Sequence, residues 1–205
     1  MCPFCAGSAT LLAGGAFLAE GWASAVVNQL RSKNNTREAV MKLVDAILLE
    51  LDQEANTTKR VLERIPDDKL SWKPHPKAFS LGQLALHIAS VPGSVAAAAV
   101  PDSMEAPNFS QPEAKSRQEV LDTFSSSLRS AKEALQNMDD ARLNSTWSLT
   151  KNGKVIMAVP RIVFLRSILM NHNYHHRGQL SVYLRILDVP VPSIYGPSAD
   201  ENPFA

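Results

Sequence analysis

The sequence predicts an all-α protein whose main domain is a bundle of four long helices. From Thr36 onward, apolar residues recur almost throughout at intervals of three and four, which is the period of an amphipathic helix. Prolines and capping residues divide this pattern into four segments of helix length. The chain has 205 residues, of which 45% are hydrophobic and 20% are charged. It therefore has room for one such domain and an appendage.

The first helix is expected over residues 36–65, where Thr36 supplies a cap and Pro66 ends the pattern. Its apolar positions are Val40, Leu43, Val44, Ile47, Leu48, Leu51, Ala55, Val61, Leu62 and Ile65. Because these positions are spaced mostly by threes and fours, they form one buried face. A loop over residues 70–79 follows this helix.

The second helix is expected over residues 80–100. Ser80 opens it, and Gln83, three residues later, completes a capping box. Pro92 and Gly93 lie in its middle, where a proline removes a backbone donor and crowds the preceding turn. We therefore expect a kink or an interruption at this point.

The third helix is expected over residues 112–138, after a polar loop that contains prolines. The fourth begins at Pro160 and extends over residues 160–187. Between them, residues 145–159 are ambiguous. Their Asn152-Gly153 pair is typical of a tight hairpin turn, so a short β-ribbon is the alternative to a loop there.

Residues 1–35 form a separate segment, and residues 36–205 form the bundle domain. Residues 6–30 are almost wholly apolar or small, with Glu20 as their only charge, and basic residues follow directly. This length suits a membrane anchor that leaves the bundle in the cytoplasm, at the inner membrane. The glycines and Glu20 disfavour a span, and the alternative is a helix packed on the body or on another subunit of a cytoplasmic protein.

Charge and cysteine content exclude several classes of protein. The net charge is +1, and the basic residues are scattered, so nucleic acid is not an expected partner. The only cysteines are Cys2 and Cys5, which excludes a disulfide framework. Their spacing suits a redox pair or half of a zinc site, but no second pair of matching spacing lies nearby.

Histidines mark the candidate site. His172 and His176 lie four residues apart on the expected inner stripe of the fourth helix, so their side chains meet one turn apart. His87 faces inward on the second helix and is the evident third ligand for a metal ion. His175 lies about 100° around the helix from His176 and is off the stripe. His75 lies in a loop between prolines, where we expect it to be exposed.

Other interpretations of these histidines remain open at the level of spacing. A single inward histidine is commonly a hydrogen-bonded core residue, although the burial of three imidazoles without a shared partner is costly. No nucleophile-elbow sequence is present for serine catalysis, and no haem-attachment motif accompanies His172.

Two motifs and a tail resemble the DinB (YfiT-like) family. Residues 65–89 resemble the entry to the family's second helix, and residues 191–198 are similar to its usual tail. The second motif reads His172-Asn173-Tyr174-His175-His176-Arg177-Gly178-Gln179-Leu180. The resemblance extends over residues 36–203, in order and with the expected gaps, and leaves the N-terminal segment outside.

The resemblance implies a bacterial four-helix bundle of up-down-down-up order that forms a homodimer. It implies a divalent metal, typically zinc, nickel or iron, held by His87, His172 and His176, with His175 as a non-ligand. Some members of the family are S-transferases or isomerases that use a low-molecular-weight thiol, and others are metal-dependent hydrolases.

The leading functional hypothesis is therefore transfer of a thiolate to a small electrophile. Three neutral imidazoles leave a bound ion its charge and an open position for such a ligand. Arg177 and Lys73 are candidates for binding a substrate carboxylate, and the alternative is that both are solvated surface charges. Gln179 is a candidate hydrogen-bond donor to a ligand of the metal, and the alternative is a contact between helices only. A metal-dependent hydrolase and a non-catalytic, stress-associated metal-binding bundle are the alternatives.

Overall fold

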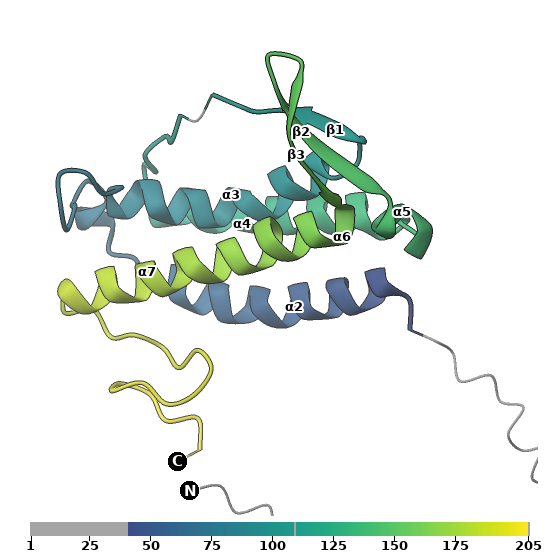
Figure 1. Cartoon of the computed structure of the whole chain (residues 1–205). Coiled ribbons are helices and arrows are strands. Elements are labelled where there is room, and N and C mark those ends of the chain that lie inside the picture. Colours follow the sequence, from purple (N-terminus) through teal and green to yellow (C-terminus); the bar gives the residue numbers. More distant parts are fainter. Residues whose placement is uncertain (1–40, 109, 205) are drawn as a thin grey trace, which may run out of the picture. The chain divides into compact units, whose positions relative to one another are not determined.

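The structure is a computed structural model that describes residues 41–204 except Phe109. The predictions for residues 1–35, for the apolar run 6–30 and for Cys2 and Cys5 lie outside the described residues. The described chain forms the predicted four-helix bundle from α2 (Leu43–Leu62), α3 (Leu81–Ala98), α4 (Arg117–Leu135) and α7 (His172–Ile186) (Figure 1). α3 and α4 run in the same direction and α2 and α7 in the opposite one, which confirms the up-down-down-up order.

The first helix is shorter than its sequence pattern. Met41 and Lys42 are not helical, and α2 begins at Leu43 instead of continuing from Thr36. Its first turn is capped from a distant element, because the Asp140 carboxylate accepts the backbone N–H of Leu43 at 3.0 Å. A 3₁₀ turn, η1 (Asp67–Lys69), follows the end of α2.

The second helix is continuous, so of the kink or interruption expected at Pro92 the interruption does not occur. Ser80 and Gln83 form the predicted capping box. Pro92 lies inside α3, yet the helix continues to Ala98. The Ser127 hydroxyl of α4 stabilises the backbone of α3 around this proline. It accepts the N–H of Gly93 at 2.7 Å and donates to the carbonyl oxygen of Ser90 at 3.1 Å.

A long crossover joins the parallel helices α3 and α4. It contains β1 (Ser103–Glu105), which the sequence pattern did not predict, and it returns along α3 to the Ser116 cap of α4 (Figure 1). α4 begins at Arg117, five residues later than expected. A short helix, α5 (Asp140–Asn144), follows it.

The predicted β-ribbon is present and gains a third strand. β2 (Thr146–Lys151) and β3 (Lys154–Pro160) pair antiparallel, with Thr146 opposite Pro160 and Lys151 opposite Lys154. Asn152 and Gly153 have φ of 53° and 74°, as the tight hairpin turn requires. β1 pairs parallel with β2, so the strand order is β1-β2-β3.

The last helical segment is not uniform. It consists of α6 (Arg161–Phe164), a π-helix η2 (Leu165–Asn171) and α7. The residues buried along this segment are Arg161, Phe164, Leu165, Leu169, Met170, Asn173, Arg177, Leu180 and Leu184. The buried face therefore continues through the π-helix, from α6 into α7.

The apolar interior consists of two clusters, one at each end of the bundle. On α2 the boundary between the two clusters lies between Leu51 and Ala55. On the last helix it lies between Met170 and Leu180. The level between them carries buried polar groups, among them Thr58, Asn173 and Arg177. Of the helices described, α3 is long and apolar enough to cross a membrane, and 56% of it is buried within the bundle.

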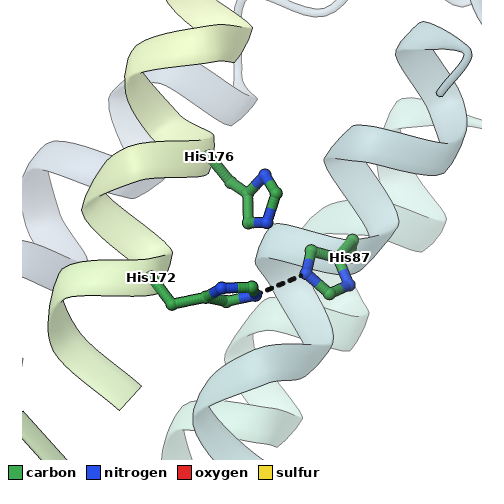
Figure 2. Close-up of side chains that lie close together, drawn as sticks. All are labelled: His87, His172 and His176. Carbon is green, nitrogen blue, oxygen red and sulfur yellow. Dashed lines mark hydrogen bonds between the residues drawn. The ribbon is translucent and has the colours of Figure 1, made fainter. Parts of the chain in front are cut away.

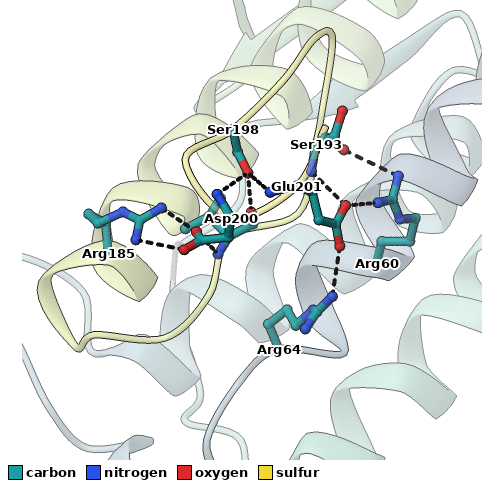
Figure 3. A network of polar contacts seen from close by, with 8 residues as sticks. Arg60, Arg64, Arg185, Ser193, Ser198, Asp200 and Glu201 are labelled. Carbon is teal, nitrogen blue, oxygen red and sulfur yellow. Dashed lines mark hydrogen bonds and ion pairs between the residues drawn. The ribbon is translucent and has the colours of Figure 1, made fainter. Parts of the chain in front are cut away.

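The C-terminal tail folds back onto α2 and α7 (Figure 3). Glu201 forms ion pairs with Arg60 and Arg64 of α2 and accepts the N–H of Ser193 at 3.0 Å. Asp200 pairs with Arg185 of α7. These contacts hold the tail against the two helices.

Arg161 joins the sheet to the helices. Its side chain is 0% exposed, and its guanidinium donates to the carbonyl oxygens of Ala99 and Arg142 at 2.7 Å each and to the Asp102 carboxylate at 2.8 Å. These partners belong to two segments that are distant from Arg161 in the sequence, the end of α3 with the residues that follow it and α5. Arg161 therefore holds the end of α3, α5 and the strands together.

We expect Arg161→Met to lower the free energy of unfolding by about 2–4 kcal/mol, because buried carbonyl groups lose their donors. The matched control is Arg166→Met, since Arg166 pairs with Glu50 at the surface and such pairs contribute at most about 1 kcal/mol. Denaturant unfolding measures both. Equal losses for the two variants would contradict the role of Arg161.

Candidate metal centre

Three histidines from two helices converge near the middle of the bundle (Figure 2). His87 comes from α3, and His172 and His176 come from α7. Each offers a ring nitrogen, and these nitrogens lie within 4.8 Å of one another. The Nε2 atoms of His87 and His172 are 2.9 Å apart. All three side chains are partly buried, which leaves the cluster open to a ligand from solvent.

Local structure places each histidine. His172 and His176 are one turn apart on α7, as the four-residue spacing predicts. They do not lie on the inner stripe as expected, because Asn173 and Arg177 occupy the buried positions and the two histidines lie beside them, partly exposed. His87 lies two turns into α3, whose start is fixed by the Ser80 capping box. The two helices are neighbours in the bundle, so the three rings face one another (Figure 2).

Glutamine side chains orient two of the rings. Nδ1 of His176 donates to Oε1 of Gln179 at 2.7 Å, so Gln179 accepts this hydrogen bond, whereas the sequence led us to expect a donor. Nδ1 of His87 donates to Oε1 of Gln111 at 3.0 Å. A neutral imidazole with its proton on Nδ1 has a free lone pair on Nε2. His87 and His176 are therefore both held with Nε2 ready to bind a metal.

Gln111 is a site residue that sequence reasoning missed. It lies in the crossover, 24 residues after His87, with no periodic pattern to mark it. Its amide donates to the carbonyl oxygen of Gln83 at 3.1 Å, and the Gln83 amide donates back to the carbonyl oxygen of Gln111 at 3.0 Å. This reciprocal pair fixes the amide orientation of Gln111, so that its oxygen faces His87.

Burial keeps the three imidazoles uncharged. Desolvation, opposed by the hydrogen bond to Gln179 and assisted by the neighbouring histidines, lowers the pKa of His176 to about 4. Desolvation also lowers the pKa of His87 and of His172. Among the described residues, no carboxylate contributes to these shifts. The cluster therefore presents neutral nitrogen donors at neutral pH, the form in which histidine binds metals.

The other candidate residues lie elsewhere. His175 and His75 are exposed and outside the cluster, as expected. Lys73 is exposed in the loop before α3. Arg177, predicted as a substrate-binding or surface residue, is instead 1% exposed and pairs with Glu54 at 2.6 Å. It faces the bundle interior because it lies one position around the helix from His176, so the prediction for Arg177 is wrong.

Aromatic side chains lie beside the cluster. The ring of Phe79 is 6.0 Å from the ring of His87 and is 39% exposed. The hydroxyl of Tyr183 donates to the carbonyl oxygen of Phe79 at 3.3 Å, and the Tyr183 ring packs edge-on against Trp72 at 5.6 Å. The loop before α3 thus adds an apolar surface next to His87.

The geometry fits a divalent ion. Zinc binds imidazole nitrogen at about 2.0–2.1 Å, which places two ligands of a tetrahedral shell about 3.3 Å apart. The observed 2.9 Å between His87 and His172 is close to this separation. His172 donates from Nε2 to Nε2 of His87, so metal binding through this atom requires that its proton move to Nδ1 or leave. The three histidines could therefore hold a metal ion.

Fold and site together define a helical bundle with a cluster of three histidines, and comparisons with known proteins agree on the fold. The DinB family model matches residues 32–202, and the chain belongs to this family. The uncharacterized protein YrdA of Bacillus subtilis is 25% identical over 167 residues, which cover 79% of this chain and 93% of YrdA.

Two solved structures share the fold. A DinB-like protein from Bacillus cereus is 25% identical, with a TM-score of 0.60 over 73% of this chain and 95% of that protein. The DinB-like protein YjoA from Bacillus subtilis is 19% identical, with a TM-score of 0.57 over 73% of this chain and 96% of YjoA.

The lowered pKa values predict how acid acts on the metal-free protein. Between pH 6.5 and about 4 the unfolded chain protonates His176 while the folded chain does not. The unfolded state then binds more protons, so the free energy of unfolding falls as the pH falls through this window. Denaturant unfolding in the presence of a chelator measures this dependence.

Proposed function

We propose that His87, His172 and His176 bind one divalent metal ion, either zinc, nickel or iron. The observation that carries this proposal is the convergence of three neutral imidazoles, two of which are fixed by glutamine carbonyls with Nε2 free. A set of three nitrogen ligands is typical of metal centres that keep a position open for a substrate.

We further propose that the chain is a metal-dependent transferase that joins a low-molecular-weight thiol to a small electrophile. A bound ion would lower the pKa of a coordinated thiol, so that the thiolate forms at neutral pH. The protein itself supplies a neutral donor set without an acidic partner among the described residues. This environment favours an anionic ligand such as a thiolate.

The surroundings of the cluster support a small organic substrate. Phe79 offers an apolar surface beside His87, and Lys73 is an exposed cation in the same loop that would attract a substrate carboxylate. Such thiols are kept reduced in the cytoplasm, which is the location we propose. A hydrolase is less well supported, because no described carboxylate is placed to act as a base next to the cluster.

We expect about one divalent metal per chain in protein purified without a histidine tag. His176→Ala should lose this metal, and so should the His172→Ala, His176→Ala double variant. The matched control is His175→Ala, since His175 is adjacent in sequence but outside the cluster. Elemental analysis measures the content. Full occupancy in the double variant, or loss in the control alone, would overturn the site.

We expect the metal-loaded protein to accelerate the reaction of a bacterial low-molecular-weight thiol with chlorodinitrobenzene. The thiolate sulfur bonds to the ring carbon, and chloride leaves. The rate should fall to that of the double variant when the metal is removed. A metal-loaded protein that is no faster than the double variant would contradict the transferase and favour the non-catalytic bundle.

A further inference from the structure

Pro92 leaves a buried carbonyl group of α3 without its helical donor. A proline has no N–H, and its ring crowds the carbonyl of the residue four positions earlier. That residue is Ile88, which is 0% exposed and directly follows His87. A buried carbonyl oxygen without a donor is costly, so a partner must come from outside the helix.

Asn173 of α7 supplies that partner. Its Nδ2 donates to the carbonyl oxygen of Ile88 at 3.3 Å, and the contact is buried. Asn173 directly follows His172, just as Ile88 directly follows His87. The hydrogen bond therefore joins the two histidine-bearing helices at the level of the cluster.

The oxygen of the Asn173 amide indicates that this side chain is not explained by its contribution to stability alone. Asn173 is 6% exposed, and its Oδ1 is buried without a partner among the described residues. An unpartnered buried oxygen destabilises a fold. The side chain thus carries a penalty at Oδ1 while its Nδ2 holds the two helices together.

We propose that Asn173 is a positioning residue of the metal centre, which acts through its hydrogen bond to the carbonyl that Pro92 leaves free. The bond sets the separation and register of α3 and α7, so that His87 meets His172 and His176. This inference rests on the proposed metal binding, and it assigns a role to a residue that contacts no ligand.

The chain offers a matched control on the opposite side of the same proline. Ser127 of α4 also forms hydrogen bonds to α3 next to Pro92, through Gly93 and Ser90, but it joins α3 to a helix without cluster histidines. Ser127→Ala and Asn173→Ala therefore both remove a side-chain hydrogen bond to the backbone of α3, and only the second removes a link between the histidine helices.

The experiment compares wild type, Asn173→Ala, Ser127→Ala and the Asn173→Ala, Pro92→Ala double variant. Zinc affinity is measured by competition with a chromophoric chelator, and the absorption spectrum of the cobalt-loaded protein reports the ligand geometry. Denaturant unfolding of the metal-free forms measures stability separately. The double variant guards against a single variant that fails to fold, because Pro92→Ala restores an N–H that can donate to Ile88.

We expect Asn173→Ala to weaken zinc binding by about tenfold or more, in the range for residues that support metal ligands, and to change the cobalt spectrum. Ser127→Ala should lose stability but bind zinc within about twofold of wild type. The double variant should regain stability yet stay weak in zinc binding, because the carbonyl is satisfied while the link between helices is still absent.

If the double variant binds zinc as tightly as wild type, the proposal is wrong. Asn173 would then serve only to satisfy the carbonyl group of Ile88. An equal loss of affinity in Ser127→Ala would also overturn the proposal, because any loosening of α3 would then suffice. A wild-type protein that binds no zinc, nickel or iron overturns the proposed function instead. In that case, a double variant no more stable than Asn173→Ala would separately overturn the hydrogen bond.

Discussion

The middle of the bundle is organised by one requirement, that polar groups buried between the two apolar clusters find partners inside the protein. Arg177 shows it most clearly. Its guanidinium pairs with Glu54, donates to Thr58 at 3.1 Å and lies over the rings of Tyr174 and Tyr195. Because Tyr195 belongs to the tail, this buried charge connects α7, α2 and the tail at a single level. A buried ion pair contributes little net stability, but loss of one partner is strongly destabilising.

The same level of the bundle determines how the histidines are presented. Asn173 and Arg177 occupy the buried stripe of α7, and His172 and His176 precede them by one position each. This offset turns the two imidazoles toward the edge of the interior, where they are half-buried. Full burial would close the cluster to a substrate, and full exposure would leave the rings free to rotate. The polar layer thus gives the site both its rigidity and its access.

The features that the sequence predicted correctly are those that depend on interactions between residues close together in the chain. The Ser80–Gln83 capping box, the Asn152-Gly153 turn and the histidine pair on α7 each depend on neighbours within four residues, and each was predicted. Where the structure differs from what the sequence predicted, contacts between residues far apart in the chain explain the difference. α2 begins at Leu43 because Asp140, 97 residues later, caps it. α3 continues through Pro92 because Ser127 and Asn173 compensate. An average helical period does not reveal the π-helix, and Gln111 belongs to a loop without periodicity.

The outer partners of the histidines bear on the chemistry. Metal-binding histidines often donate to a carboxylate, which raises their basicity and offsets part of the charge of the ion. Here the partners of His87 and His176 are glutamine amides, which carry no charge. An ion held by these residues would keep more of its positive charge, and an anion that completes its coordination would be bound more strongly. The neutral partners therefore support the proposal that a metal ion held by His87, His172 and His176 would bind an anionic ligand such as a thiolate, next to the apolar surface of Phe79.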